Sequence, residues 1–424
     1  MILRAATVWP LSAPPLRPGA VAVREGRIAA VGLAREVQPQ PGEPVWELGE
    51  AIILPGLVNA HAHLELSHLR GRVPYRGRFT AWLRDLVLAR WRWSPRDWLA
   101  SARTGCAELL RHGITTVGDI TFSGASFTAV RESGLRGVVF QEVLGFRAAE
   151  AERAWAQRTE PLWKEAASPS ERVRLGLSPH APYSTSAALY ARCLEQARQH
   201  GWLLATHLAE TLAEGEFLRT GQGELRKAMQ RFRQFDRRWS PPGVSPVAYL
   251  QGLGFGTVPG LAIHCNYLSE QDIGLLRQSR LTVVYCPRSH TFFEHRDHPV
   301  ERLLAAGVPV ALGTDSLASN DRLDLLAEVR EAARKHPGVP PETWLRLATL
   351  EGARALGWAE ETGSLEVGKA ADLMAARGPA GNLPSWGGGK LERAVAEALA
   401  GEAHEVVLTM VAGEVRFEEE GRPG

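Results

Sequence analysis

The sequence predicts an α/β fold: a (β/α)8 TIM barrel with a small β-sandwich domain formed by both chain ends. Two observations carry this prediction. Eight short apolar runs alternate with helix-like segments through the middle of the chain, and shorter strand-like segments occupy both ends. Eight parallel strands are the number that closes such a barrel. We therefore expect residues 54–362 to form the barrel, and residues 1–53 and 363–424 to form one composite β domain.

The N-terminal part of that β domain reads as a hairpin between loops. Residues 20–24 and 27–31 flank the dipeptide Glu25-Gly26, which is typical of a tight hairpin turn. Proline-rich stretches at 14–18 and 39–44 mark loops on either side.

The barrel elements follow from residue 52 onwards. Apolar runs with the length of buried strands recur between segments of helical periodicity, which favours a parallel sheet with helices outside it. The expected strands are residues 52–59, 115–120, 137–143, 173–177, 203–207, 260–264, 281–286 and 308–313. The expected helices are residues 80–91, 98–111, 187–199, 270–277 and 300–306.

An insertion at residues 211–259 separates the fifth and sixth runs. Arginines and aromatic residues lie close together in it, a combination that also occurs in nucleic-acid binding. The segment is short and contains Pro241-Pro242-Gly243, so we favour a loop over the barrel mouth. After residue 355 the chain returns to short strands, around 363–374, 406–412 and 414–417, which could pair with the N-terminal strands.

Composition excludes several classes of protein. The 49 Lys and Arg residues nearly balance the 47 Asp and Glu residues, so a net charge of +2 gives no reason to expect nucleic acid as a partner. The longest apolar stretch, residues 303–312, is far shorter than the ~20 residues of a membrane-spanning helix. No signal-peptide pattern begins the sequence, and four cysteines without a CxxC pair fit a reducing compartment. We expect a cytoplasmic protein with no membrane partner.

The strongest chemical signal is the pair His61 and His63, directly after the first apolar run. Residues i and i+2 of a strand point to the same side, so both imidazoles would face one way at the carboxyl end of a barrel strand. Two imidazoles on one face suit zinc or iron. The pair alone is weak evidence, because a His-x-His sequence arises by chance in many chains.

Three more residues of the right chemical type follow expected strands. His207, His264 and Asp315 end the fifth, sixth and eighth runs. Any one of them could be a buried, hydrogen-bonded polar residue with no role in chemistry. Their convergence at several strand ends is hard to explain by accident, and predicts a metal or acid–base site at the mouth of the barrel.

Five segments together resemble the amidohydrolase superfamily, and most closely its branch of hydrolytic deaminases and triazine chlorohydrolases. They are residues 54–63 (LPGLVNAHAH), 178–183 (SPHAPY), 206–211 (THLAET), 263–265 (IHC) and 313–320 (GTDSLASN). The closing segment 363–373 (GSLEVGKAADL) is similar to the β domain that this superfamily shares.

The resemblance implies a site for one divalent metal ion, with zinc the first expectation and iron the alternative. Its ligands would be His61, His63, His207 and Asp315. Members with two ions bridge them through a lysine or glutamate on the fourth strand. Here that strand ends in Ser178-Pro179-His180, without a lysine, so a single ion is implied. Three histidines and one carboxylate leave a position for water.

The resemblance also implies an acid–base group. Glu210 matches the glutamate that moves protons to the substrate ring, although it could otherwise be an exposed loop residue. His264 matches the histidine that orients the attacking hydroxide. The implied reaction begins when Glu210, with His264 and Asp315, accepts a proton from water. Hydroxide then adds to the carbon that bears an exocyclic amine, Glu210 protonates the adjacent ring nitrogen, and ammonia leaves.

Five further residues are candidate substrate contacts, each with a structural alternative. His180 matches a position that contacts the sugar or ring in nucleoside deaminases, and Arg147 follows the third strand, where relatives place an arginine towards the ligand. The segment HAHLELS adds Glu65, and the segment YCPRSH adds Arg288 and His290. The side chain of Arg288 could bind a carboxylate.

This combination resembles the aminodeoxyfutalosine deaminases of menaquinone biosynthesis, whose substrate is an adenosine-like nucleoside that carries a benzoate. Two alternatives stay open. The same metal site could serve a chlorohydrolase or amidase of another nitrogen heterocycle, or the chain could be a non-catalytic assembly protein on this fold. A small-molecule substrate is the expected partner. A homodimer through Trp91, Trp93 and Trp98 is possible, although these side chains could equally pack on the barrel.

Overall fold

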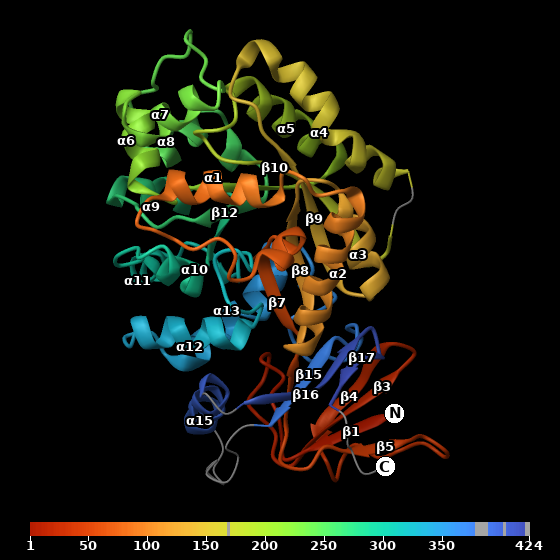
Figure 1. The fold of residues 1–424 in the computed structure, drawn as a ribbon. Helices are drawn as coiled ribbons and strands as arrows, with labels where there is room; N and C mark the ends of the chain where they lie inside the picture. The colour runs from red at the N-terminus through yellow and green to blue at the C-terminus, as the bar shows by residue number, and fades with distance from the viewer. Residues whose placement is uncertain (168–169, 378–388, 402–403, 420–424) are drawn as a thin grey trace.

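The computed structural model describes residues 1–167, 170–377, 389–401 and 404–419. Its centre is an eight-stranded parallel sheet surrounded by helices, as the sequence predicts (Figure 1). Neighbouring strands follow chain order throughout, which is the topology of a (β/α)8 barrel. The strands are β7 (Leu57–Ala62), β8 (Ile114–Thr121), β9 (Arg136–Val143), β10 (Val173–Pro179), β11 (Leu203–Leu208), β12 (Gly260–His264), β13 (Leu281–Tyr285) and β14 (Val310–Leu312).

The first and last strands meet just beyond the end of β14. Ala62 forms a parallel bridge with Asp315, and the backbone amides of Thr314 and Asp315 donate to the carbonyl oxygen of His61 at 3.0 and 3.1 Å. This contact closes the sheet, and it places Asp315 directly beside the histidines that follow β7.

The apolar run at 52–59, predicted as one strand, is two strands in different sheets. β6 (Ile52–Pro55) pairs with the terminal strands, whereas β7 begins the barrel. Gly56 lies between them in very close contact with β8, because a Cβ atom there would lie 2.1 Å from Oγ1 of Thr115. The absence of a side chain lets the chain cross from one sheet to the other at this point.

All five predicted helices are present, with ends within three residues of those expected. They are α1 (Phe79–Arg90), α2 (Pro95–Arg111), α5 (Ala187–His200), α9 (Glu270–Arg277) and α11 (Val300–Ala305). The structure adds further helices that the sequence did not reveal. These are α3 (Ala125–Ser133), α4 (Ala151–Ala166), α10 (Pro287–Phe292), α12 (Leu325–Lys335), α13 (Pro341–Leu347), α14 (Leu350–Ala355) and α15 (Gly389–Ala400), with 3-10 turns at Leu64–Leu69 and Ala148–Glu150.

The insertion at 211–259 is not the predicted loop. It folds into α6 (Leu212–Thr220), α7 (Gly223–Arg231), α8 (Pro246–Gly252) and a 3-10 turn at Phe255–Thr257. Its apolar side chains are packed: Phe217 is fully buried and stacks on Trp239 with ring centroids 4.6 Å apart. The segment therefore contributes to an apolar cluster that it shares with α1 and the 3-10 turn at Leu64–Leu69, and its many arginines obscure these buried positions in the sequence.

Two small sheets lie beside the barrel (Figure 1). One is formed by N-terminal strands, and the other combines strands from both chain ends. The predicted hairpin is β3 (Gly19–Arg24) and β4 (Arg27–Leu33), with Glu25 and Gly26 both at positive φ, and these strands share a sheet with β1 (Ile2–Ala5) and β5 (Val45–Glu47). The second sheet joins β6 to β2 (Thr7–Val8), β15 (Leu373–Arg377), β16 (Glu405–Val411) and β17 (Glu414–Glu418). A domain division at residues 53/54 and 362/363 stays a prediction.

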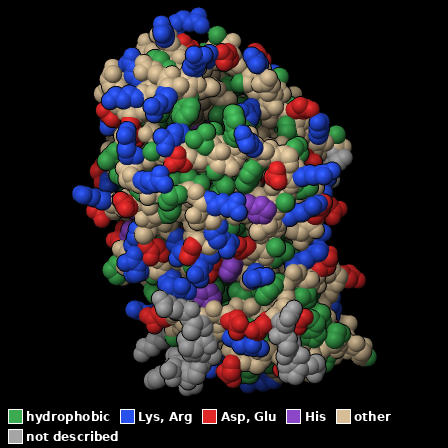
Figure 2. Space-filling model, in the orientation of Figure 1, with side chains coloured by type: hydrophobic (Ala, Val, Ile, Leu, Met, Phe, Trp, Pro, Cys, Tyr) green, Lys and Arg blue, Asp and Glu red, His purple; other side chains and the backbone are tan. Residues whose placement is uncertain are grey.

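The surface carries both signs of charge. Lys and Arg side chains are interspersed with Asp and Glu over the visible face, in keeping with the small net charge (Figure 2). Within the part of the chain that the structure describes, no helix combines the length and apolar character needed to cross a bilayer.

Candidate active site

Three histidines converge at the carboxyl ends of the barrel strands. His61 lies in β7, His63 directly follows it, and His207 lies in β11. One ring nitrogen from each lies within 4.8 Å of the others, and the Nε2 atoms of His63 and His207 are 3.2 Å apart. These three of the four predicted metal ligands therefore come together as expected.

Asp315 completes the set. Its Oδ1 lies 3.6 Å from Nε2 of His61 and 3.8 Å from Nε2 of His63. Burial alone would raise the pKa of this carboxyl, but the interaction with His61 and the nearby imidazoles bring the pKa well below its usual range. Oδ2 accepts hydrogen bonds from the hydroxyls of Ser289 at 2.6 Å and Ser319 at 2.9 Å, which fix the carboxylate in place.

The donor set fits one divalent ion. Both ring nitrogens of His61 are buried, and neither has a hydrogen-bond partner among the residues that the structure describes. Burial lowers the pKa of His207 to about 3 and that of His63 well below its ordinary value, so both imidazoles are neutral. Nδ1 of His207 lies 3.0 Å from the carbonyl oxygen of His180 and donates to it, which leaves the Nε2 lone pair facing the cluster. Neutral imidazoles with free lone pairs are what a metal ion requires.

Glu210 and His264 lie beside this cluster, and the Glu210 carboxylate comes within 3.7 Å of Nε2 of His264. Both side chains are buried. Burial, followed by the charges of Asp315 and Glu214, raises the pKa of Glu210 well above its ordinary value. A carboxyl with a raised pKa next to an imidazole is suited to take up and release a proton during a reaction.

The sequence reasoning missed the residues that hold these two groups in place. The buried Glu214 accepts hydrogen bonds from the backbone amides of Ala209 and Glu210, and Asn266 donates to the carbonyl oxygen of Glu210 at 3.0 Å. His298 donates to the carbonyl oxygen of His264 at 2.8 Å. Only Glu214 left a signal, since Thr211 precedes it by three residues in the pattern of a helix N-terminus.

The predicted substrate contacts lie at different places around the mouth. His180 lies next to the cluster: its ring centroid is 5.0 Å from that of His207, and its Nε2 is 4.0 Å from the carboxylate of Glu142. Arg147 pairs with Glu150 and donates to a carbonyl oxygen of the insertion. His290 is buried in a group of imidazoles that includes His298.

Two of the predicted contacts are already engaged by the protein. The Glu65 carboxylate accepts hydrogen bonds from hydroxyls and backbone amides of residues 121–125. Arg288 pairs with Asp321 and lies 3.8 Å from Glu328. The roles of all five residues as substrate contacts stay predictions.

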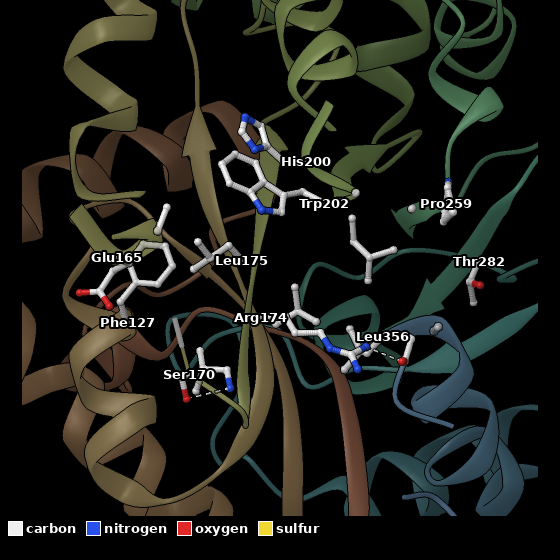
Figure 3. Close-up of a pocket in the computed structure, with 18 of the residues that line it drawn as sticks. Phe127, Glu165, Ser170, Arg174, Leu175, His200, Trp202, Pro259, Thr282 and Leu356 are labelled. Atoms are coloured by element: carbon white, nitrogen blue, oxygen red, sulfur yellow. Dashed lines mark hydrogen bonds between the residues drawn. The ribbon is translucent and has the colours of Figure 1, made fainter. Parts of the chain in front are cut away.

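A cavity of ≈ 680 Å³ lies at the opposite end of the strands (Figure 3). Its walls include Val173, Leu203 and Gly260, the first residues of β10, β11 and β12. Arg174 and Trp202 project into the same region. None of the predicted site residues is among the described residues that line it. In a barrel of this kind chemistry occurs at the carboxyl ends of the strands, so we place the candidate active site at the histidine cluster.

A parallel barrel with three histidines and an aspartate at the carboxyl ends of its strands defines a class of metal-binding barrel proteins. Comparison with known proteins is consistent with that class. The model of the amidohydrolase family matches residues 52–416, and the chain belongs to this family. The family expectation from the sequence motifs is therefore confirmed.

Individual relatives support the same assignment. A 5-methylthioadenosine/S-adenosylhomocysteine deaminase of Moorella thermoacetica is 33% identical over 394 residues, which cover 88% of this chain and 85% of that protein. The crystal structure of an adenosine deaminase from Xanthomonas campestris with bound zinc is 27% identical, with a TM-score of 0.81, and the match covers 98% and 92% of the two chains. Helicobacter pylori aminofutalosine deaminase, 24% identical with a TM-score of 0.84 over 98% and 99% of the chains, shows the shared fold.

Proposed function

We propose that this protein is a metal-dependent hydrolytic deaminase of a 6-aminopurine nucleoside. The observation that carries the proposal is the position of Glu210, buried within 3.7 Å of His264 at the edge of the histidine–aspartate cluster. Relatives above 30% identity that are named deaminases of adenosine derivatives support the choice of reaction.

His61, His63, His207 and Asp315 would hold one divalent ion. Zinc is our first choice because the structural relative from Xanthomonas campestris contains it, and the same donors also suit iron. When bound, such an ion supplies Lewis-acid activation of water. Ser289 and Ser319 orient the aspartate, and the carbonyl oxygen of His180 orients the imidazole of His207.

The chain's own residues then move the proton. Glu210 accepts a proton from the attacking water and returns it to the purine ring nitrogen next to the carbon that bears the amine. His264 and Asp315 orient the attacking oxygen. Addition of water and loss of ammonia convert the 6-amino group into a 6-oxo group, which balances the reaction.

For the particular nucleoside we propose aminodeoxyfutalosine, which would give the enzyme a role in menaquinone biosynthesis. The proposal rests on the resemblance carried together by the segments HAHLELS at 61–67 and YCPRSH at 285–290. Methylthioadenosine and S-adenosylhomocysteine, named for the Moorella relative, share the 6-aminopurine and differ in the group on the ribose. A cytoplasmic location and a homodimer also stay proposals.

The test is ammonia release from the zinc-loaded protein with these three nucleosides, adenosine, guanine and cytosine. We expect turnover of one or more of the nucleosides. Glu210→Gln should retain its metal and lose roughly 10²- to 10⁴-fold in kcat, because the proton carrier is gone. Glu216→Gln, an exposed carboxyl in the adjoining helix, is the control and should keep full activity. Chloride release from a chlorotriazine, or acid release from a cyclic amide, in place of ammonia would overturn the deaminase proposal.

A further inference from the structure

Two arginines near the active site lack the partners that arginines usually have. Arg90 ends α1 and Arg158 lies in α4. Within residues 1–167, 170–377, 389–401 and 404–419, neither guanidinium forms an ion pair or a hydrogen bond with another side chain. Burial lowers the pKa of both groups. Glu142 acts electrostatically on both arginines and Glu65 on Arg90, but within the described residues no carboxylate contacts either guanidinium, which leaves both able to bind an anion.

Both cations face one aromatic ring. The guanidinium carbon of Arg90 is 4.9 Å from the ring centroid of Phe122, and that of Arg158 is 4.1 Å from the same centroid. Phe122 directly follows β8, at the carboxyl end of the barrel strands. Its backbone amide donates to Glu65, which holds the segment in place. The two arginines and the ring therefore form one unit, which we call the Phe122 clamp.

The clamp lies near His180, which borders the metal cluster. Arg90 is close enough for its charge to lower the pKa of His180, after the larger effect of burial, and the ring of His180 is 5.0 Å from that of His207. Glu65 also acts electrostatically on Arg90, and the ion-pair contact of Glu142 is with His180 at 4.0 Å. Phe122 follows β8, the strand that pairs with β7, so a ligand at the metal cluster can extend past His180 towards the clamp.

The arginines suggested by the sequence are less suited to this task. Arg288 is taken up by Asp321, Glu328 and Asn320, and Arg147 by Glu150. Within the described residues, Arg90 and Arg158 form no ion pair with an acidic side chain, and part of each arginine is exposed to solvent.

We propose that the Phe122 clamp is a carboxylate subsite, which binds an anionic group on the part of the nucleoside remote from the reacting amine. The inference rests on the proposed function, because it describes the substrate of that same site. A guanidinium can bind a carboxylate through two parallel hydrogen bonds, and a second guanidinium can hold the remaining lone pairs. The Phe122 ring keeps both guanidiniums in place while the site is open.

The test compares two nucleosides that share the thioadenosine part and differ in the group on the sulfur. Methylthioadenosine ends in a methyl group, whereas S-adenosylhomocysteine ends in an amino acid, with a carboxylate and an ammonium. We would measure kcat/KM for both with wild-type protein, Arg90→Gln and Arg158→Gln, and the controls Arg84→Gln and Arg153→Gln on the same two helices. Arg84 pairs with Asp85 on the surface, and Arg153 is exposed.

We expect either clamp variant to lose roughly 10- to 100-fold in kcat/KM for the carboxylate nucleoside, the range of a hydrogen bond to a charged group. The value for methylthioadenosine should change less than about threefold, and the controls should change neither. Arg90→Lys should retain part of the preference for the carboxylate nucleoside, because it keeps the positive charge but loses the two parallel N–H donors of the guanidinium. An equal loss for both nucleosides, or no loss, would overturn the subsite.

Failure of the proposed function gives a different result. If wild-type protein releases ammonia from neither nucleoside, calorimetric binding of both decides the matter without turnover. Tighter binding of the carboxylate nucleoside that disappears in Arg90→Gln supports the subsite in a protein with another activity. Equal binding overturns the subsite, and no binding of either nucleoside overturns both proposals.

Discussion

Several residues at the active-site strand ends adopt a backbone conformation that side chains rarely favour. His264 has φ 73°, Asp315 φ 57° and Ala209, next to Glu210, φ 50°. Each such residue costs about 1–2 kcal/mol. Hydrogen bonds from His298 and to Glu214, and the link between Asp315 and β7, hold these residues in place. The strained residues lie where the candidate site residues point into the mouth of the barrel. Strained backbone conformations commonly cluster at active sites.

The two serines on Asp315 lead to a prediction at this scale. Ser289→Ala removes the 2.6 Å hydrogen bond to the carboxylate and should weaken metal binding roughly 10- to 100-fold, the usual effect of losing a partner of a ligand. Competition with a chelator measures it. Ser289 lies just beyond the carboxyl end of β13, and Ser279, before its start, is the control. Unchanged affinity in Ser289→Ala would show that Asp315 needs no such support.

Residue types at strand ends predicted a metal or acid–base site, and the resemblance to the amidohydrolase superfamily supplied the four expected ligands and Glu210. Ser289, Ser319 and Asn266 were not predictable, because serine and asparagine are common in loops and their roles depend on contacts between distant segments. Arg90 and Arg158 were hidden for a different reason. An arginine in a helix usually lies on a solvated surface, and only the fold brings these two to the same ring.

At the scale of elements, Glu65 organises the turn between β8 and α3. It accepts hydrogen bonds from the amides of Phe122, Ser123 and Ala125 and from two hydroxyls, and its side chain is buried. An ionised carboxylate suits this role for two reasons: it only accepts hydrogen bonds, and its negative charge is favourable at the N-terminus of a helix. Glu65 therefore sets the position of Phe122.

Glu65→Gln should lower the free energy of unfolding by about 2 kcal/mol, because an amide nitrogen cannot accept and leaves buried donors unpaired. Thermal unfolding measures the effect. Glu132→Gln, which breaks an exposed ion pair with Arg103, should cost less than about 1 kcal/mol. If Glu65 instead binds substrate directly, KM would rise in the variant with no change in thermal stability.

The imidazoles between β12 and α12 predict acid sensitivity. Burial lowers the pKa of His298 to about 3 and of His295 to about 4, with the charge of Lys335 acting in the same direction. These histidines are neutral in the fold, so their stabilising contribution is present above pH 6.5 and is lost as pH falls towards 4. At pH 5, which is about 1.5 units below the pKa of about 6.5 of histidine in the unfolded chain, each neutral buried imidazole lowers the free energy of unfolding by about 2 kcal/mol.

His298→Gln should therefore show a smaller fall in Tm between pH 7.5 and pH 5 than wild-type protein. Its Tm at pH 7.5 serves as the baseline, because glutamine can still donate to the carbonyl oxygen of His264. His68→Gln, at an exposed position, should follow wild-type protein at both pH values. An identical fall in Tm for His298→Gln and wild type would contradict the assignment.

The barrel strands were predictable because they are continuous apolar runs, and five helices between them were found from their periodicity. Length did not decide which helices were found, because α4, with 16 residues, was missed and α11, with 6 residues, was predicted. The break at Gly56 was not predictable, because both halves of the run are buried in sheets and look alike in sequence. The helices of the insertion were missed because charged residues surround their few buried positions, such as Phe217.

At the scale of the whole molecule, one buried ion pair joins the barrel to the terminal sheets. Arg136, the first residue of β9, lies 2.7 Å from the carboxylate of Asp372, just before β15. Both side chains are almost fully buried, and Asp372 also accepts from the amide of Ala412. The segment 363–373, which resembles the shared β domain of the family, thus carries the residue that joins it to the barrel.

Asp372→Ala should destabilise the protein by about 3–5 kcal/mol, since it leaves Arg136 buried without its partner. Thermal unfolding measures the change, and Glu414→Gln, which loses a more exposed contact with Arg172, is the control. Replacement of both Arg136 and Asp372 by apolar residues should recover part of the loss. A loss no larger than that of the control would show that the ion pair does not join the two parts.

The sheet that contains β6 has a consequence for how the protein is made. β2 and β6 are synthesised before the barrel, but β15, the neighbour of β6, begins only at Leu373, after the barrel. Until β15 has been made, one edge of β6 has no strand to pair with, while the hairpin of β3 and β4 can form at once. A nascent chain that stalls after the barrel exposes an apolar strand edge of the kind that captures other chains. β15 therefore protects the edge of β6 only after the whole barrel has been made.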